Sequence, residues 1–311
     1  TGRSPSSTNA LWDDPSVWSP GGVPTQVDSI FIPSGTTMTI PAGVNVNIGS
    51  VNNLGMLNLS AGDTIHIYGN WYNTGTFIAE TGSTVSFEND NQKIDYAKFS
   101  NLVLQGSGVK TAIDSFTVQN SFVINGVNFN DGGNVIRLSG NLSLASSYTS
   151  TGTVVFDGNT QLSGTGSLNF NNVIINGTFN DNGFSYNVSG NWTKATTGIF
   201  VSSGKTTFTG SSSQIISNTN FNEIELDKSG GNVSQSGDVI ISNGFTQSNA
   251  SYSTNNKSLS VSGNLILNGG TFNATSSTIS ITRDFISNAA FTPSSSTIVL
   301  NRNGSQTLNV P

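Results

Sequence analysis

The sequence has no cysteine, few charged residues and one histidine, and these absences exclude several classes of protein. Without cysteine the chain has neither disulfide bonds nor thiolate chemistry, so it is not a disulfide-stabilised scaffold. Charged residues make up 9% of the 311 residues, and the net charge is −6. Nucleic acids and anionic membranes attract clustered lysine and arginine, so neither is an expected partner.

Long hydrophobic runs are also missing. No run approaches the 18 residues of a membrane span, so we expect no membrane insertion. The opening residues TGRSPSSTNALW lack the features of a signal peptide, which we expect to have been removed or to lie outside this sequence. The composition favours Ser, Thr, Asn and Gly over helix formers, while 18 Phe and 4 Trp indicate a buried core. The fold class is therefore predicted to be all-β.

A short pattern recurs along the chain: an alternating segment, a turn resembling Gly-Asn, and then an apolar residue. Two further patterns recur with it in a constant order: a Gly-Thr-Phe-like segment leading into Ser/Thr alternation, and an aromatic residue followed by glutamine and another strand. The first pattern ends at Trp71, Phe122, Leu142, Trp192, Phe245, Leu265 and Phe285.

These recurring segments predict a solenoid. A unit of about 20 residues with two or three short strands cannot bury its apolar face alone, whereas stacked units can. We expect a right-handed parallel β-helix, with residues 1–40 as an N-terminal cap segment and residues 41–311 as about 13 coils that continue beyond the sequence. At about 4.8 Å per coil this is a rod of about 60–65 Å. Antiparallel β-sandwich domains are the alternative, because Asn-Gly and Asp-Gly dipeptides are also typical of hairpins.

The asparagine of the repeated turn has two interpretations. Its side-chain amide is expected to bond to the asparagine one coil away, forming a ladder. Alternatively, each asparagine stands alone and adopts a left-handed conformation. Arg283 and Asp284 replace Gly-Asn at the last such turn, so we expect them to interrupt any ladder there.

The segment Trp12–Ile40 has the sequence WDDPSVWSPGGVPTQVDSIFIPSGTTMTI. It resembles the opening of secreted surface proteins of Bacteroidetes. It is also similar to the start of the G8 domain, and the later repeats resemble those of the same large proteins. The resemblance implies export across the outer membrane, often by the type IX system, and a role as an adhesin or surface fibre. The motifs DSI and DTI resemble an O-glycosylation motif of that group, which implies modification of Ser29 and Thr64.

Catalytic chemistry has few candidate residues. His66 alternates with isoleucines and is expected to face solvent, and a triad with Asp63 lacks a nucleophile elbow. Glu88, Asp90 and Asp95 are candidates for Ca²⁺, as in β-helices that cleave acidic polysaccharides. The acids of the other glycine-rich loops are expected to have turn roles: Asp131, Asp157 and Asp181.

Aromatic and threonine residues provide two further hypotheses. Trp71, Tyr72 and Trp192 directly follow the Gly-Asn turn and are candidates for stacking on sugars. However, leucine and phenylalanine occupy the same repeat position elsewhere, which favours a core role for this position. Segments such as TTMTI suggest ice binding, but the threonines do not keep a regular register across the repeats.

The sequence therefore favours a non-enzymatic extracellular protein, a rigid stalk or filament segment with a structural or adhesive role. The expected partners are other surface-protein subunits or the rest of its own chain, together with glycans in the alternative reading. No cofactor is expected, with Ca²⁺ as the one candidate ion. The alternatives are a β-helix that binds or cleaves glycans and an ice-binding protein.

Overall fold

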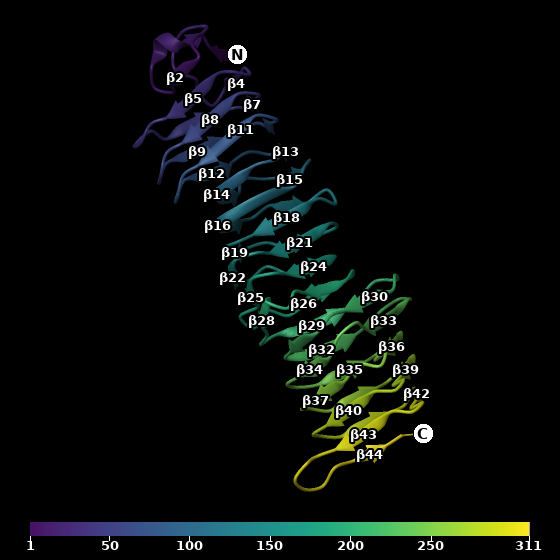
Figure 1. Ribbon diagram of the computed structural model, residues 1–311. Helices are drawn as coiled ribbons and strands as arrows, with labels where there is room; N and C mark the ends of the chain where they lie inside the picture. The colour runs from purple at the N-terminus through teal and green to yellow at the C-terminus, as the bar shows by residue number, and fades with distance from the viewer. Residues whose placement is uncertain (311) are drawn as a thin grey trace. The chain divides into compact units, whose positions relative to one another are not determined.

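The computed structural model describes residues 1–310, and in this part the chain forms a parallel β-solenoid of about 14 turns (Figure 1). These residues contain no α-helix and one 3-10 turn, η1 (Pro15–Val17). The predicted all-β parallel solenoid is confirmed. The sandwich alternative is wrong, because strands one turn apart pair in parallel. The right-handed sense stays a prediction.

The chain divides into two compact units. The first comprises Thr1–Gly152 with Ser163–Ser167, and the second comprises Thr153–Leu162 with the chain from Leu168 onward. Each unit contains its own ladders of parallel strands, and each is described by itself.

The first unit has three ladders, in which equivalent strands of successive turns lie side by side (Figure 1). The first ladder is β1 (Gly2–Pro5), β4 (Ser29–Ile32), β7 (Val51–Asn53), β10 (Trp71–Asn73), β13 (Gln92–Ile94), β15 (Val109–Ala112), β17 (Asn128–Asn130) and β20 (Tyr148–Thr149). The second is β2 (Asn9–Leu11), β5 (Thr37–Ile40), β8 (Met56–Leu59) and β11 (Thr76–Ala79). The third is β6 (Val46–Ile48), β9 (Thr64–Ile67), β12 (Thr84–Phe87), β14 (Lys98–Leu104) and β16 (Phe116–Ile124), which pairs with both β18 (Val135–Leu138) and β19 (Asn141–Leu144).

The second unit has four ladders. The first is β23 (Leu168–Phe170), β26 (Tyr186–Val188), β29 (Lys205–Phe208), β32 (Glu223–Leu226), β35 (Phe245–Gln247), β38 (Leu265–Leu267), β41 (Phe285–Ser287) and β44 (Leu308–Asn309). The second is β21 (Thr153–Phe156), β24 (Asn172–Ile175), β27 (Trp192–Lys194), β30 (Gln214–Ile216), β33 (Asn232–Gln235), β36 (Ser251–Ser253), β39 (Thr271–Asn273) and β42 (Ala290–Thr292). The third is β22 (Asn159–Gly164), β25 (Thr178–Asn180) and β28 (Ile199–Val201). The fourth is β31 (Thr219–Phe221), β34 (Val239–Ile241), β37 (Leu259–Val261), β40 (Thr278–Ile281) and β43 (Thr297–Leu300).

The repeated apolar residue after each turn is a core residue. Phe245 pairs with Leu265, and Leu265 pairs with Phe285, so the 20-residue period of the sequence equals one turn of the solenoid. Alternate residues of each strand point to opposite faces, which places this position inside together with its equivalents one turn away. All seven residues of the pattern are at most 1% exposed: Trp71, Phe122, Leu142, Trp192, Phe245, Leu265 and Phe285.

Glycine at the repeated turn is required by the close approach of successive turns. A Cβ atom on Gly263 would lie 1.6 Å from the carbonyl oxygen of Asn243, one turn earlier. A Cβ atom on Gly140 would lie 1.9 Å from the carbonyl oxygen of Asn120. No side chain fits at these corners, so the Gly-Asn pattern reflects steric exclusion as well as turn propensity.

Asparagine at the corners bonds mainly to the backbone of the next turn. The Asn264 side-chain oxygen accepts the N–H of Asp284 at 3.1 Å, and the Asp284 carboxylate accepts the N–H of Thr307 at 2.8 Å. The predicted ladder of amides at the corners is therefore wrong in its bonding pattern. Without a ladder the predicted interruption by Arg283 and Asp284 does not arise, and the Asp284 carboxylate accepts the same kind of backbone bond as Asn264. An amide-to-amide bond occurs instead within strands, between Asn53 and Asn73 at 2.8 Å.

The parallel pairing begins earlier than the predicted boundary at residue 40. Strands β4 and β5 lie inside the predicted cap segment, yet they pair in parallel with β7 and β8. The part that differs from the repeats is η1 with β3 (Trp18–Ser19), which pairs with β1 in an antiparallel arrangement. The tryptophans and prolines around η1 made all of residues 1–40 differ in sequence from the later repeats.

Candidate functional site

The two tryptophans that were candidates for sugar stacking lie in the core. Trp71 and Trp192 are both 0% exposed, and each contacts phenylalanine rings inside its unit. The stacking hypothesis is therefore wrong for these two residues, and the core role expected from the repeat position is confirmed. Tyr72 is half-buried and occupies the alternate position of β10. The indole N–H groups of Trp71 and Trp192 have no hydrogen-bond acceptor among residues 1–310.

The three acidic residues considered for Ca²⁺ have separate partners. One Glu88 carboxylate oxygen contacts Nδ1 of His66 at 2.5 Å. The Asp95 carboxylate accepts the backbone N–H groups of Asn73 and Tyr96. Asp90 accepts a bond from a buried lysine through its backbone carbonyl oxygen. Across residues 1–310, no three side chains of His, Cys, Asp or Glu are grouped so that they can hold a metal ion.

The only histidine forms a surface pair with Glu88. As predicted, His66 is on the outward side of β9, with 34% of its side chain exposed. Burial would raise the pKa of Glu88, but hydrogen bonds from His66, Ser86 and Gln105 outweigh this effect and lower it below its usual value. Asp63, the formal third member of a triad, accepts the N–H of Gly43. The histidine and Asp63 are therefore each engaged with another partner.

Asp131 is a fully buried carboxylate that joins two turns of the first unit. Its oxygens accept the hydroxyl groups of Ser150 at 2.5 Å and Thr151 at 2.6 Å, and the backbone N–H groups of Gly152 and Gly133 at 3.2 and 3.1 Å. Burial would raise the pKa of Asp131, but these hydrogen bonds outweigh burial and lower it. The turn role expected from the sequence is confirmed, with a depth of burial that the sequence analysis did not predict.

The second unit contains the same arrangement at Asp181. This carboxylate is also fully buried, and it accepts the N–H groups of Gly183, Ser203 and Gly204 together with the Ser203 hydroxyl. The local sequences FNDGGN and FNDNGF lie 50 residues apart and carry the shared signal Phe-Asn-Asp-x-Gly. Both carboxylates are fully occupied by donors of the protein itself, which leaves them no free lone pair toward solvent.

Two buried lysines bond to carbonyl oxygens instead of carboxylates. Lys110 is 0% exposed, and its Nζ donates to the carbonyl oxygens of Asn89, Asp90 and Ser107. Burial lowers the pKa of Lys110 to about 8. Lys228 is 4% exposed and has three acceptors of the same chemical kind, and burial lowers its pKa too. The sequence analysis missed both residues, although the strand alternation around Lys110 places it inward.

The recurring glutamine of the third sequence pattern also links turns. Its Nε2 group donates to two carbonyl oxygens of the preceding corner, which explains why an amide recurs at this position. Gln161 belongs to the same sequence pattern, but its side chain is exposed and the neighbouring Thr160 takes the inward position. The three glutamines that bridge corners are Gln92, Gln214 and Gln306.

The two hydroxyl residues considered for O-glycosylation both follow a buried aspartate. Asp28 and Asp63 point inward with 3% and 6% exposure, whereas Ser29 is exposed and Thr64 is half-buried. The alternation of strands β4 and β9 explains this placement, because consecutive residues face opposite sides. Modification of these hydroxyl groups remains a prediction.

A file of outward residues in the second unit bears on ice binding. Strands β31, β34, β37, β40 and β43 pair in register, so one outward position per strand forms a straight file. This file contains one asparagine, two serines and two β-branched apolar residues, with no threonine. It does not present the repeated hydroxyl spacing that ice binding requires. Its members are Asn220, Ile240, Ser260, Ser280 and Val299.

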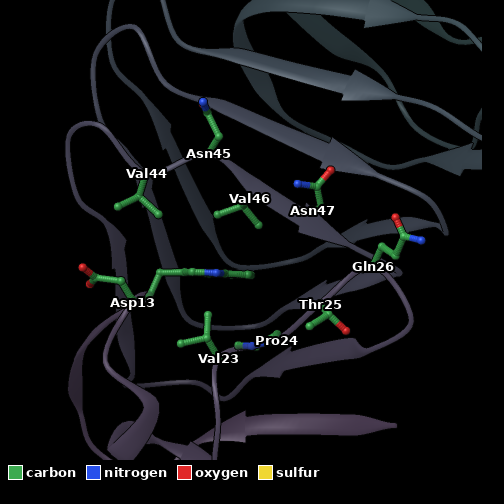
Figure 2. Close-up of a pocket in the computed structure, with 10 residues that line it drawn as sticks. Asp13, Val23, Pro24, Thr25, Gln26, Val44, Asn45, Val46 and Asn47 are labelled. Atoms are coloured by element: carbon green, nitrogen blue, oxygen red, sulfur yellow. The ribbon is translucent and has the colours of Figure 1, made fainter.

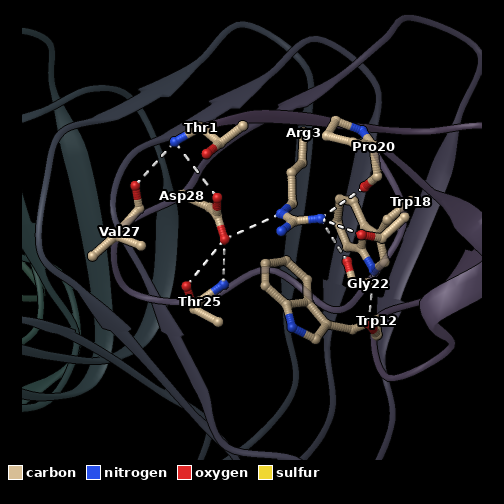
Figure 3. A network of polar contacts seen from close by, with 10 residues as sticks. Thr1, Arg3, Trp12, Trp18, Pro20, Gly22, Thr25, Val27 and Asp28 are labelled. Carbon is tan, nitrogen blue, oxygen red and sulfur yellow. Dashed lines mark hydrogen bonds and ion pairs between the residues drawn. The ribbon is translucent and has the colours of Figure 1, made fainter.

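The N-terminal segment is fixed by an ion-pair network centred on Asp28 (Figure 3). The Asp28 carboxylate lies 3.1 Å from Nε of Arg3 and accepts two bonds from Thr25, both at 3.0 Å. The terminal amine of Thr1 lies 3.5 Å from the same carboxylate. The backbone bond from Thr25 has the largest effect on the pKa of Asp28, which is lowered to about 2. The Arg3 guanidinium also donates to three carbonyl oxygens of the next loop, including that of Gly22.

A groove of about 490 Å³ lies beside this network, between residues 23–26 and residues 44–47 (Figure 2). We call it the edge groove, because β6 forms one of its walls. Trp12, which packs edge-to-face on Trp18 at 5.1 Å, also lines the groove and is 2% exposed. Asp13 is the only charged residue among those that line the groove.

Comparisons with family models, with curated proteins and with solved structures found no match. Within residues 1–310, no helix is long and apolar enough to cross a membrane.

Proposed function

We propose that the chain is a non-enzymatic structural segment, a rigid β-solenoid stalk or filament piece of a secreted or cell-surface protein. Its use of buried polar groups is the observation that carries the proposal. Asp131, Asp181, Lys110 and Lys228 are the groups that an active site would require, and all of them bond to neighbouring turns. Buried charges satisfied in this way stabilise one register of the turns, and these four groups do not face a substrate.

The extracellular location and the surface role rest on the sequence. The segment Trp12–Ile40 resembles the opening of secreted surface proteins of Bacteroidetes, and the absence of cysteine is compatible with a large repetitive core that needs no disulfide bonds. Other subunits, the rest of the same chain and glycans are the proposed partners. Glycans attached at Ser29 and Thr64 would project outward from strands β4 and β9.

A turnover screen separates this proposal from a polysaccharide-cleaving β-helix. The protein is incubated with neutral and acidic polysaccharides, with and without added Ca²⁺, while reducing ends and unsaturated products are measured. We expect no product above the buffer blank. Product formation that is lost when Glu88 is replaced by Gln would overturn the structural proposal and support the enzyme. A glycan array with the same protein tests the binding alternative.

Single-molecule pulling between the two ends tests the mechanical role. A stalk segment should keep its length under load and then unfold in discrete cooperative steps, because neighbouring turns are joined by continuous ladders and buried bonds. Gradual extension at low force would contradict the proposal.

A further inference from the structure

The third ladder of the first unit has an open edge at its first strand. In the part of the chain that the structure describes, β6 pairs with β9 alone. The carbonyl oxygen of Ile48 accepts the N–H of Tyr68 at 2.8 Å, so the backbone groups of Ile48 point toward β9. In a parallel strand, alternate residues direct their backbone groups to opposite neighbours. The N–H and C=O groups of Asn45 and Asn47 therefore point away from β9, into the edge groove.

Just after β6, the backbone N–H on this open side is bonded to another segment of the same chain. The N–H of Gly49 points to the same side as that of Asn47, and it bonds to the carbonyl oxygen of Asp28 at 2.8 Å. Before that point the opposite wall is residues 23–26, which include Pro24 and so have one N–H fewer for pairing. The groove therefore begins on the N-terminal side of the Gly49–Asp28 bond, where residues 44–47 no longer pair with residues 23–26.

The size and direction of the groove fit one short strand. An extended residue in a sheet occupies about 3.3 Å along the strand, about 4.8 Å between strands and about 10 Å across the sheet, or roughly 160 Å³. A volume of about 490 Å³ therefore holds about three residues. In Figure 2, the walls from Val23 to Gln26 and from Val44 to Asn47 run in the same direction. A strand between them with the same direction would be parallel to β6, as β9 is.

The lining determines the chemistry of the occupant. Trp12 lines the groove and is 2% exposed, so its indole occupies the core side and an inward side chain of the occupant must be small. Asp13 is the only charge in the lining and lies at the Val44 end, where a parallel strand begins. A basic residue at the N-terminal end of the occupant complements this carboxylate.

We infer that the edge groove binds an extended peptide segment of a partner protein, which adds a parallel strand to β6. The segment carries a basic residue beside Asp13 and small residues over Trp12. Main-chain hydrogen bonds to Asn45 and Asn47 supply the pairing, as in other cases of strand addition to an exposed edge. This inference is independent of the proposed structural function.

The binding test uses one synthetic probe, the hexapeptide Lys-Thr-Ala-Thr-Ala-Thr with fluorescein at its C-terminus, and measures fluorescence anisotropy with the full chain. We expect saturable binding that is abolished when alternate amides of the peptide are N-methylated, because methylation removes the donors of the ladder. Asp13→Asn should weaken binding about two- to five-fold, the range of an exposed ion pair, while the matched variant Asp114→Asn leaves it unchanged. No saturable binding, or equal binding of the methylated peptide, overturns the inference.

A second pair of variants distinguishes the groove from the rest of the surface. Val44→Trp places an indole in the groove and should abolish binding, whereas Val103→Trp, on an outward position of β14, should not.

Hydrogen exchange at the open edge of β6 tests the inference directly. The Asn47 amide should exchange rapidly in the free protein and slow at least ten-fold with the probe. An Asn47 amide that is protected in the free monomer overturns the inference. A dimer in sedimentation that the probe dissociates also overturns it, because the occupant is then a second copy.

Discussion

Replacement of Asp131 by asparagine is the sharpest test of the role of the buried carboxylates. The substitution keeps the size of the side chain and removes one acceptor oxygen and the charge. Both oxygens accept a backbone N–H, from Gly133 on one side and from Gly152 on the other. In one orientation the new NH₂ group faces the buried N–H of Gly152. In the other it faces the N–H groups of Gly133 and Thr151, and Gly133 then keeps the Thr151 hydroxyl as an acceptor. The hydroxyl groups of Ser150 and Thr151 can rotate, but a backbone N–H cannot.

The expected cost follows from these contacts. One buried donor left without an acceptor costs about 1–3 kcal/mol, and the remaining bonds lose their charge-assisted strength. Relief of the desolvation of the charge offsets part of this loss. We therefore expect Asp131→Asn to lower the free energy of unfolding of the first unit by about 2–4 kcal/mol. Asp114→Asn, at an exposed position, should change it by less than about 0.5 kcal/mol.

Urea denaturation followed by circular dichroism measures the difference, and hydrogen exchange at the Thr151 and Gly152 amides locates it. The pH dependence gives a second readout. The folded-state pKa of Asp131 is lowered, so its stabilisation is complete above the unfolded value near 4 and is lost as the pH falls through the folded value. The variant should lack this acid-sensitive contribution. Equal stability of wild type and variant at pH 7, with unchanged exchange at both amides, would refute the reasoning.

Substitutions at four further positions test other parts of the structure. Trp192→Phe should cost less than about 1.5 kcal/mol because the indole N–H has no acceptor to lose, whereas Trp192→Ala should cost about 3–5 kcal/mol in urea denaturation. Because the pKa of Lys110 is about 8 in the folded chain and near 10.4 in the unfolded chain, wild-type stability should rise from pH 8 to 9.5; Lys110→Met should reduce this rise, while the contribution of Lys228 remains. Asp28→Asn should reduce the loss of thermal stability that the wild type shows between about pH 4 and 2, because the contribution of Asp131 remains; a variant with the same acid transition contradicts the assignment. Asp284→Asn should be neutral within about 0.5 kcal/mol, and Asp284→Leu should cost about 1 kcal/mol, because only the latter removes the acceptor for Thr307.

The fold could be predicted because its determinants are local and repeated. The alternation of each strand and the constant order of three patterns indicate a solenoid, and the leucine and phenylalanine equivalents of Trp71 and Trp192 place these tryptophans inside. The first turn was harder to recognise, since the prolines and tryptophans of residues 1–40 hide the parallel strands β4 and β5.

The polar interior could not be predicted as fully, because its partners lie one turn away and the offset varies. Glu88 and Asp95 each contact a residue 22 positions earlier, whereas Asp131 accepts bonds from Ser150 and Thr151, 19 and 20 positions later. Asp284 did not interrupt the corner bonds, since any side-chain oxygen at that position accepts the next N–H. Lys110 contradicts the rule that charged residues face outward, and only the three carbonyl oxygens around it explain its burial.

The edge groove was outside the reach of sequence patterns altogether. Its floor is Trp12, and its walls come from residues 23–26 and 44–47, which share no motif. The open backbone of Asn47 is a property of register and not of side-chain type. A strand at the beginning of a ladder carries the same sequence pattern as one in its interior.

The distance distribution between two spin labels tests the rigid-stalk proposal most directly. The chain has no native cysteine, so Thr76→Cys in the first unit and Thr278→Cys in the second can be labelled selectively. The pair Thr76→Cys and Asn128→Cys, both in the first unit, is the control for label flexibility. A rigid stalk predicts that pulsed electron paramagnetic resonance gives a single inter-unit distance, with a distribution as narrow as that of the control pair. A broad or bimodal inter-unit distribution would contradict the account, because a stalk with a hinge between its units cannot hold its ends at a fixed separation.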